Sequence, residues 1–152
     1  MILIRFWGRV LSLLWFSSLC YASELRYHTS IDIVERGGCV YLKIAHFNDG
    51  AKTMFFQPDE PAILLLDGNM KRLPFLGIIA KRPEYTLAEH LQLAPGEVLE
   101  REIYLNTSYG IKKAGKYTVS VNVDYFDPVA QKGYEKGNVV KEFRYDGRCK
   151  KK

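Results

Sequence analysis

The sequence contains few of the side chains that enzymes use most often for catalysis and for metal binding. It has three histidines and three cysteines in 152 residues. His28, His46 and His90 form no His-x-x-x-His pair, and the His-Glu-x-x-His signature of zinc peptidases does not occur. Each histidine is therefore expected to be a surface residue or a satisfied strand residue, and no metal ligand is predicted.

The patterns of nucleophilic catalysis and phosphate binding are also missing. No Gly-x-Ser-x-Gly elbow occurs, and Gly37-Gly38 precedes a strand pattern rather than the helix that a phosphate loop requires. The paired carboxylates Asp59 and Glu60 lie between two prolines, which favours a stiff, solvated loop. We therefore predict no catalytic residue and no cofactor, and we expect that the protein is not an enzyme.

No apolar run is long enough to be predicted as a membrane span. Residues 10–22 are thirteen, whereas a spanning helix needs about 20. Arg5 and Arg9 precede this run, and the small residues Cys20 and Ala22 end it. We predict that residues 1–22 are a signal peptide cleaved after Ala22, and that the protein is periplasmic or secreted. A membrane anchor is the rival interpretation; a lipid-modified Cys20 is disfavoured by the bulky residue before it.

The net charge of +5 is concentrated outside the expected domain. Residues 23–147 carry sixteen Lys and Arg against seventeen Asp and Glu, whereas residues 148–152 include four basic side chains and no acidic one. We expect residues 148–152 to be a basic C-terminal tail, either solubilising or weakly attracted to anionic lipid or polysaccharide. A nucleic-acid partner is not predicted, because no basic stripe is evident in the body of the sequence.

Removal of the signal peptide leaves two cysteines, Cys39 and Cys149. An even number in an oxidising compartment favours a disulfide, and two free thiols are the alternative. The bridge would close a loop of about 110 residues, and loops of that length stabilise a fold by several kcal/mol in the chain-entropy model. We predict a disulfide that ties the C-terminus to an early strand.

The remaining sequence is built of short alternating segments separated by turn residues. The clearest runs from 116 to 125, where Tyr117, Val119, Val121 and Val123 alternate with polar side chains. Asn48-Asp49-Gly50 and similar turn signals recur between such segments. We predict an all-β fold over residues 23–147, an immunoglobulin-like antiparallel β-sandwich of about seven to nine strands.

Two local motifs are predicted to be structural. Tyr117, early in a late strand, resembles a tyrosine corner, in which the hydroxyl binds nearby backbone. Pro95 and Gly96 form a turn pair between two strand segments. Both motifs argue for the fold and not for an activity.

Part of the chain also resembles a known family. The matching pieces are Gly77-Ile78-Ile79-Ala80-Lys81-Arg82, Leu91-Gln92-Leu93-Ala94-Pro95-Gly96-Glu97, Ile103-Tyr104-Leu105 with Tyr109, and Ala114-Gly115-Lys116-Tyr117-Thr118-Val119. With Asn48 after an early strand, residues 77–121 resemble the β-sandwich domain that precedes the catalytic domain of deuterolysin-type zinc metallopeptidases. Some of these turns are shared with other sandwich families, including bacterial proteinase-inhibitor domains.

The resemblance implies a non-catalytic, prodomain-like module, because the zinc ligands of the peptidase are missing from this sequence. Its expected partner is a protein, a secreted metallopeptidase in particular, which the module would inhibit or help to fold. An accessory module that binds the envelope or a carbohydrate is the alternative. Sugar-binding surfaces usually use tryptophan, however, and both tryptophans, Trp7 and Trp15, lie in the predicted signal.

The candidate contact residues are apolar side chains in three segments, 54–57, 74–79 and 125–128. A partner would be bound by loop insertion or by addition of a strand to a sheet edge. The same side chains could instead pack in the core or anchor loops. They are Phe55, Phe56, Phe75, Ile78, Tyr125 and Phe126.

Overall fold

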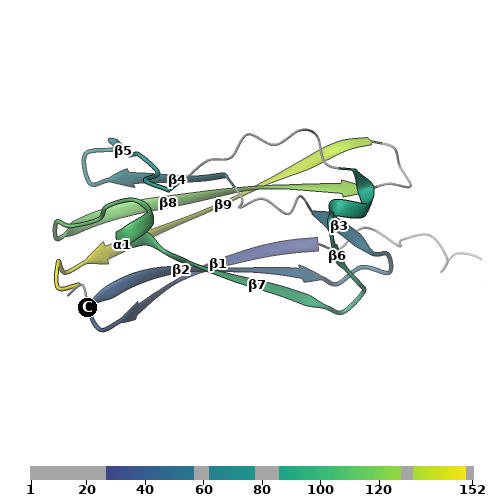
Figure 1. Cartoon of the computed structure of the whole chain (residues 1–152), viewed down its shortest axis with the longest axis horizontal. Coiled ribbons are helices and arrows are strands. Elements are labelled where there is room, and N and C mark those ends of the chain that lie inside the picture. The colour runs from purple at the N-terminus through teal and green to yellow at the C-terminus, as the bar shows by residue number, and fades with distance from the viewer. Residues whose placement is uncertain (1–26, 57–61, 78–85, 128–131, 150–152) are drawn as a thin grey trace, which may run out of the picture.

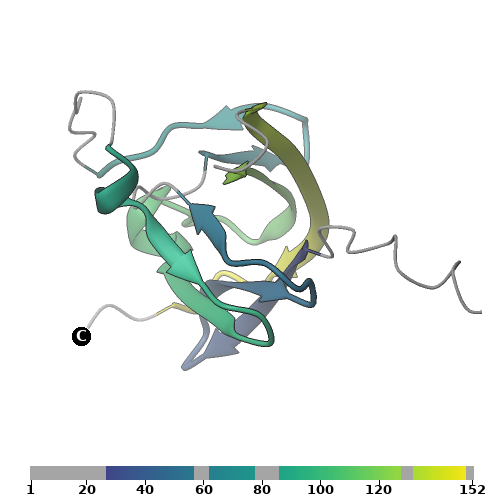
Figure 2. The ribbon, with the colours of Figure 1, turned by 90° about the vertical axis from the view of Figure 1, so that its right-hand side faces the viewer.

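The chain folds into two facing antiparallel β-sheets, as the sequence predicts. A computed structural model describes residues 27–56, 62–77, 86–127 and 132–149. In these ranges nine strands form an immunoglobulin-like sandwich (Figure 1), and Figure 2 shows the two layers facing each other across the interior. Within the same ranges, no helix has the length and apolar character to cross a bilayer. The predicted signal peptide lies outside the described residues.

The strands divide between a three-stranded and a six-stranded sheet. The first has the order β1-β2-β7, and the second is built around β8, with β9 on one edge. Strands β4 and β3 pair with successive parts of the other edge of β8. On its far side β4 pairs with β5, and β3 pairs with β6. In chain order the described elements are β1 (Tyr27–Arg36), β2 (Cys39–Asn48), β3 (Met54–Phe56), β4 (Ala62–Asp67), β5 (Arg72–Leu73), η1 (Leu87–Glu89), β6 (Leu91–Leu93), β7 (Val98–Tyr104), α1 (Leu105–Ser108), β8 (Gly115–Asp127) and β9 (Lys132–Tyr145).

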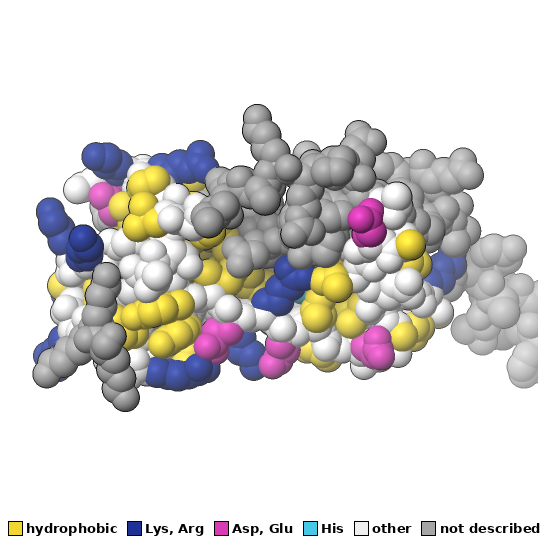
Figure 3. Space-filling model, in the orientation of Figure 1, with side chains coloured by type: hydrophobic (Ala, Val, Ile, Leu, Met, Phe, Trp, Pro, Cys, Tyr) yellow, Lys and Arg dark blue, Asp and Glu magenta, His cyan; other side chains and the backbone are white. Residues whose placement is uncertain are grey.

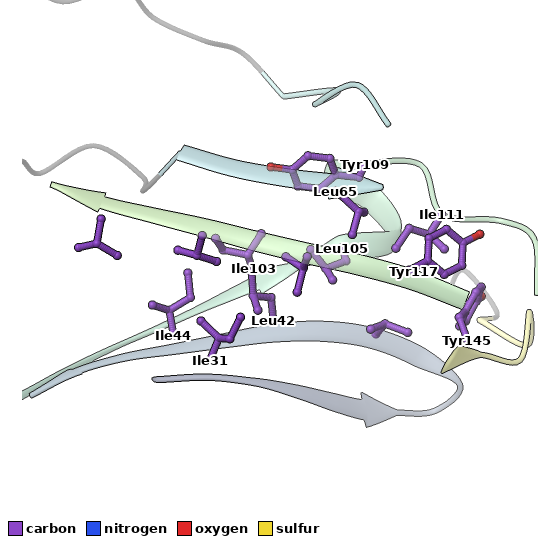
Figure 4. Close-up of a cluster of buried hydrophobic side chains, with 14 of the residues drawn as sticks. Ile31, Leu42, Ile44, Leu65, Ile103, Leu105, Tyr109, Ile111, Tyr117 and Tyr145 are labelled. Carbon is purple, nitrogen blue, oxygen red and sulfur yellow. The ribbon is translucent and has the colours of Figure 1, made fainter. Parts of the chain in front are cut away.

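The core lies between the inner faces of the two sheets (Figure 4). Period-two alternation puts Val119 and Val121 of β8 inward, where both are fully buried. Leu42 and Ile44 of β2 face them from the other sheet and are equally buried. The alternation read from the sequence is therefore the alternation that forms the core.

Tyr117 has the geometry of a tyrosine corner. Its side chain is buried, and its hydroxyl donates a hydrogen bond to the Lys113 carbonyl at 2.7 Å. The ring stacks against Phe143 of β9, with 5.6 Å between the ring centroids. Burial raises the pKa of the hydroxyl, and the nearby Asp67 and Tyr145 raise it further. The bond ties the loop before β8 to the start of that strand.

We expect Tyr117→Phe to lower the free energy of unfolding by about 1–2 kcal/mol, because the buried Tyr117 side chain loses its hydrogen bond to the Lys113 carbonyl. Urea denaturation measures the change. Tyr41→Phe is the matched control, since the Tyr41 hydroxyl has no hydrogen-bond partner within the described ranges. Equal losses in the two variants would contradict a specific role for the Tyr117 hydroxyl.

The predicted disulfide between Cys39 and Cys149 is confirmed. The sulfur atoms are 2.02 Å apart, and 110 positions separate the two residues in sequence. The C-terminal segment approaches the turn between β1 and β2 closely, so that a Cβ atom on Gly38 would lie 2.9 Å from the Arg148 carbonyl oxygen. Gly38 also has φ +75°, a conformation that favours glycine. The C-terminus is thus attached to the first sheet covalently and by close backbone packing.

Replacing both cysteines, as in Cys39→Ser with Cys149→Ser, is expected to lower the free energy of unfolding by about 2–5 kcal/mol. Denaturation of the oxidised protein, the reduced protein and the double variant tests this. The reduced protein and the double variant should agree. A wild type whose unfolding midpoint does not change on reduction would show that the bridge contributes nothing to stability.

The Pro95-Gly96 turn is held against the end of β2 by a buried asparagine. The Glu97 amide donates to the Ala94 carbonyl at 3.0 Å, and Gly96 has φ +79°, as a type II turn requires. The Gly96 amide donates to the Asn48 carbonyl. The Asn48 side chain donates to the carbonyls of Lys52 and Leu93, both at 2.8 Å. Asn48 therefore joins three segments at this end of the sandwich.

Candidate functional site

Of the six predicted contact residues, the structure places Phe56 in the core. Only 4% of Phe56 is exposed, and its ring packs near Tyr27 and His46, so a partner cannot reach it without opening the sandwich. Phe55, the preceding residue on β3, is half-buried and points the opposite way. Partner contact and core packing were both open for these phenylalanines from the sequence, and Phe56 packs in the core because its side chain faces the interior of the sandwich.

Tyr125 belongs to the same internal cluster as Phe56. It is half-buried, and its ring centroid lies 4.7 Å from that of Tyr27. Phe126 pairs with Phe55 in the strand register, but its side chain lies outside the described part of the structure. Ile78 also lies outside the described residues.

His46 is the polar centre of this cluster. It is 3% exposed, and its Nδ1 atom lies 2.8 Å from the Tyr27 hydroxyl and 3.0 Å from the Thr29 hydroxyl. Burial, together with the smaller effect of the positive charge of Arg101, lowers the pKa of His46 to about 4. Burial also raises the pKa of Tyr27. The imidazole is therefore neutral at physiological pH, as a satisfied strand residue.

Stability is expected to fall as pH decreases from 6.5, the ordinary pKa of histidine, to about 4. The unfolded chain binds the proton more tightly than the folded chain, so acid favours unfolding. Below pH 4 this histidine is expected to have lowered the free energy of unfolding by about 3 kcal/mol in total. Thermal unfolding of wild type and His46→Gln between pH 7 and about 4 tests this. The His46→Gln profile should be flatter, and identical profiles would exclude His46 as the cause.

Residues 74–77 form a strap that lies across α1 at the disulfide end of the sandwich. The Leu76 amide donates to the Ser108 carbonyl at 2.7 Å. Phe75 is half-buried, and its ring meets Tyr109 edge-on at 5.5 Å. Phe75 therefore anchors the strap, whereas the Leu76 side chain remains 61% exposed. Within the described part of the predicted segment 74–79, the exposed large apolar side chain is that of Leu76 and not that of Phe75.

A hollow of about 260 Å³ lies beside Leu76. Its wall includes the buried Ile111 and the hydroxyl-bearing Tyr104 and Tyr145. The Tyr104 hydroxyl lies 3.1 Å from the sulfur of Cys149, and the Tyr145 hydroxyl accepts a hydrogen bond from the Cys149 amide at 3.0 Å. The hollow thus combines an apolar rim with hydroxyl groups and rests on the disulfide.

The position of α1 beside this hollow depends on Asn106. Its Oδ1 atom accepts a hydrogen bond from the Val40 amide at 2.6 Å, and its Nδ2 atom donates to the Ile111 carbonyl at 3.0 Å. The side chain joins α1 to the start of β2 and to the loop before β8. Sequence reasoning included Leu76 in the candidate segment 74–79 but did not name it among the contact residues. It gave Asn106 no structural role, because the partners Val40 and Ile111 are set by the tertiary fold.

The described part of the chain contains no group of three or more potential metal ligands close enough to hold an ion. His28 lies on the outer face of the first sheet, stacked on Phe47 and 2.8 Å from an Asp49 carboxylate oxygen. His90 is buried, and its Nδ1 atom lies 2.8 Å from the Thr86 carbonyl oxygen. The three histidines lie at separate positions in the fold.

No family model and no curated protein matches the sequence. Among solved structures, a structural-genomics target is similar at 13% identity and a TM-score of 0.44, over 80% of this chain and 84% of that one. A Bordetella pertussis protein assigned as ApaA is 14% identical with a TM-score of 0.41, over 80% of this chain and 92% of that one. A β-glucosidase 3B from Thermotoga neapolitana is 16% identical with a TM-score of 0.32, over 80% of this chain and 17% of that one. Likenesses this distant carry no argument about function.

Proposed function

We propose that the protein is an exported, non-catalytic module that binds a protein partner through the strap 74–77 and the adjoining hollow. The observation that carries this proposal is that Leu76 is exposed although the backbone around it is held in place. Its side chain is 61% exposed, yet its backbone is held by Ser108 and its neighbour Phe75 is held by Tyr109. An apolar residue whose backbone is already fixed at the surface beside a hollow loses little backbone entropy when it binds a partner.

Export is supported by the disulfide and by the N-terminal sequence. Structural disulfides persist in oxidising compartments such as the periplasm and the extracellular space. The Cys39–Cys149 bridge fits that setting, and residues 1–22 have the features of a signal peptide. We therefore place the mature protein in the periplasm or outside the cell.

The partner class that we propose is a secreted metallopeptidase, which the module would inhibit or assist in folding. The support is the resemblance of residues 77–121 to the prodomain-like sandwich of deuterolysin-type peptidases. A partner side chain could enter the hollow while its backbone contacts the strap. Leu76 and Ile111 would contact the apolar part, and Tyr104 is a candidate hydrogen-bond donor.

Leu76→Ser is expected to weaken peptidase binding by at least tenfold, because it removes the exposed apolar contact. The measurements are residual activity of a panel of secreted metallopeptidases and direct binding by calorimetry. Val140→Ser is the matched control, since Val140 is 58% exposed but lies on β9. Absence of binding and inhibition by the wild type at micromolar concentration would refute the proposal. Equal losses in both variants would refute the assigned surface.

A further inference from the structure

Basic side chains from three distant parts of the sequence gather at the disulfide end of the sandwich. The segments 67–72, 108–116 and 144–149 meet there, and Figure 3 shows dark blue Lys and Arg side chains around the left-hand end. Together the three segments carry two acidic residues, Asp67 and Asp146. Their seven basic residues are Lys71, Arg72, Lys112, Lys113, Lys116, Arg144 and Arg148. We call this set the basic end.

The two acidic residues do not neutralise this set. Asp67 accepts hydrogen bonds from the amides of Asn69 and Lys71, both at 2.9 Å, within its own turn. Asp146 lies 3.4 Å from Arg148, in an exposed pair. Within the described ranges, the other six basic side chains are in no ion pair. Their charge is therefore available to an external anion.

The described turns at the opposite end carry more acidic than basic residues. Segments 49–53, 86–90 and 94–97 include Asp49, Glu89 and Glu97 against Lys52, and the adjoining ends of β8 and β9 add one residue of each sign, Asp127 and Lys132. The sandwich is elongated between the two ends (Figure 1), so the charges are separated along its long axis. Such a distribution orients a molecule toward an anionic surface with the basic end first.

Exposed apolar side chains accompany the basic ones. Met70 is 67% exposed at the tip of the turn between β4 and β5, directly before Lys71 and Arg72. The turn is closed by a hydrogen bond from the Met70 amide to the Asp67 carbonyl at 2.9 Å. Leu76 is the second exposed apolar residue at this end. The basic end thus pairs a projecting apolar tip with adjacent positive charge.

We propose that the basic end docks the protein on the surface of a bilayer that contains anionic phospholipid. Lys and Arg side chains would contact phosphate groups, and Met70 would enter the boundary between headgroups and acyl chains. Stable peripheral binding usually needs both an apolar insertion and a basic patch. An anionic polysaccharide would account for the charge but not for the exposed methionine, so lipid is the better match.

The test is sedimentation of the exported, purified protein with vesicles. Vesicles with one third phosphatidylglycerol in phosphatidylcholine should bind at least tenfold more tightly than vesicles of phosphatidylcholine alone, and molar salt should abolish the difference. Lys112→Glu with Lys113→Glu should weaken binding at least tenfold, and Met70→Ser several-fold. The controls, Lys52→Glu and Val98→Ser, change a lysine and an exposed apolar residue at the opposite end and should leave binding unchanged.

Equal binding to both vesicle types would overturn the proposal, as would equal losses in the variants and their controls. Binding to soluble dextran sulfate without binding to vesicles would assign the basic end to a polysaccharide and also overturn it. Circular dichroism of each variant confirms that the fold is retained. The outcome is separable from peptidase binding through Met70→Ser, because Met70 lies outside the hollow that Leu76 and Lys112 line.

Discussion

The rest of the structure depends on the burial of alternate side chains of β8 against the inner face of the first sheet. Val119 and Val121 are fully buried there, and β8 pairs on one edge with β9 and on the other with β3 and β4. A one-residue change of register would turn these side chains outward. Because the register is set in this way, the loop before β8 has a defined position.

The two ends of the sandwich are closed by different interactions. Hydrogen bonds from Asn48 hold together the turns next to β2 at one end, beside the buried pair of His46 and Tyr27. At the other end the chain is held by the Cys39–Cys149 disulfide and by the tyrosine corner at Tyr117. The disulfide end is also where the exposed Met70 and Leu76 lie beside basic side chains without ion pairs in the described ranges, so the binding surfaces that we propose rest on a covalently closed scaffold.

Much of the fold could be predicted because its causes are local. The alternation over residues 116–125 identified β8, and the Pro95-Gly96 turn reflects conformations that those two residues favour. Phe56 shows where this reasoning ends. An apolar run such as 54–56 does not reveal which side chain faces inward, because that depends on the strands on either side. The anchoring role of Phe75 likewise depends on Tyr109, 34 positions later in the sequence.

From the sequence by itself, the sandwich, the disulfide and the structural turns follow, since each depends on side-chain periodicity, compartment or local backbone preference. The surfaces were decided by the tertiary structure. Lys71, Lys112 and Arg144 are far apart in sequence, and they gather at one end because antiparallel strands bring their turns and ends together there. Leu76 is exposed because Phe75 takes the inward position beside α1. The clustering of charged side chains and the exposure of an apolar one depend on distances in three dimensions, which composition and spacing along the chain do not specify.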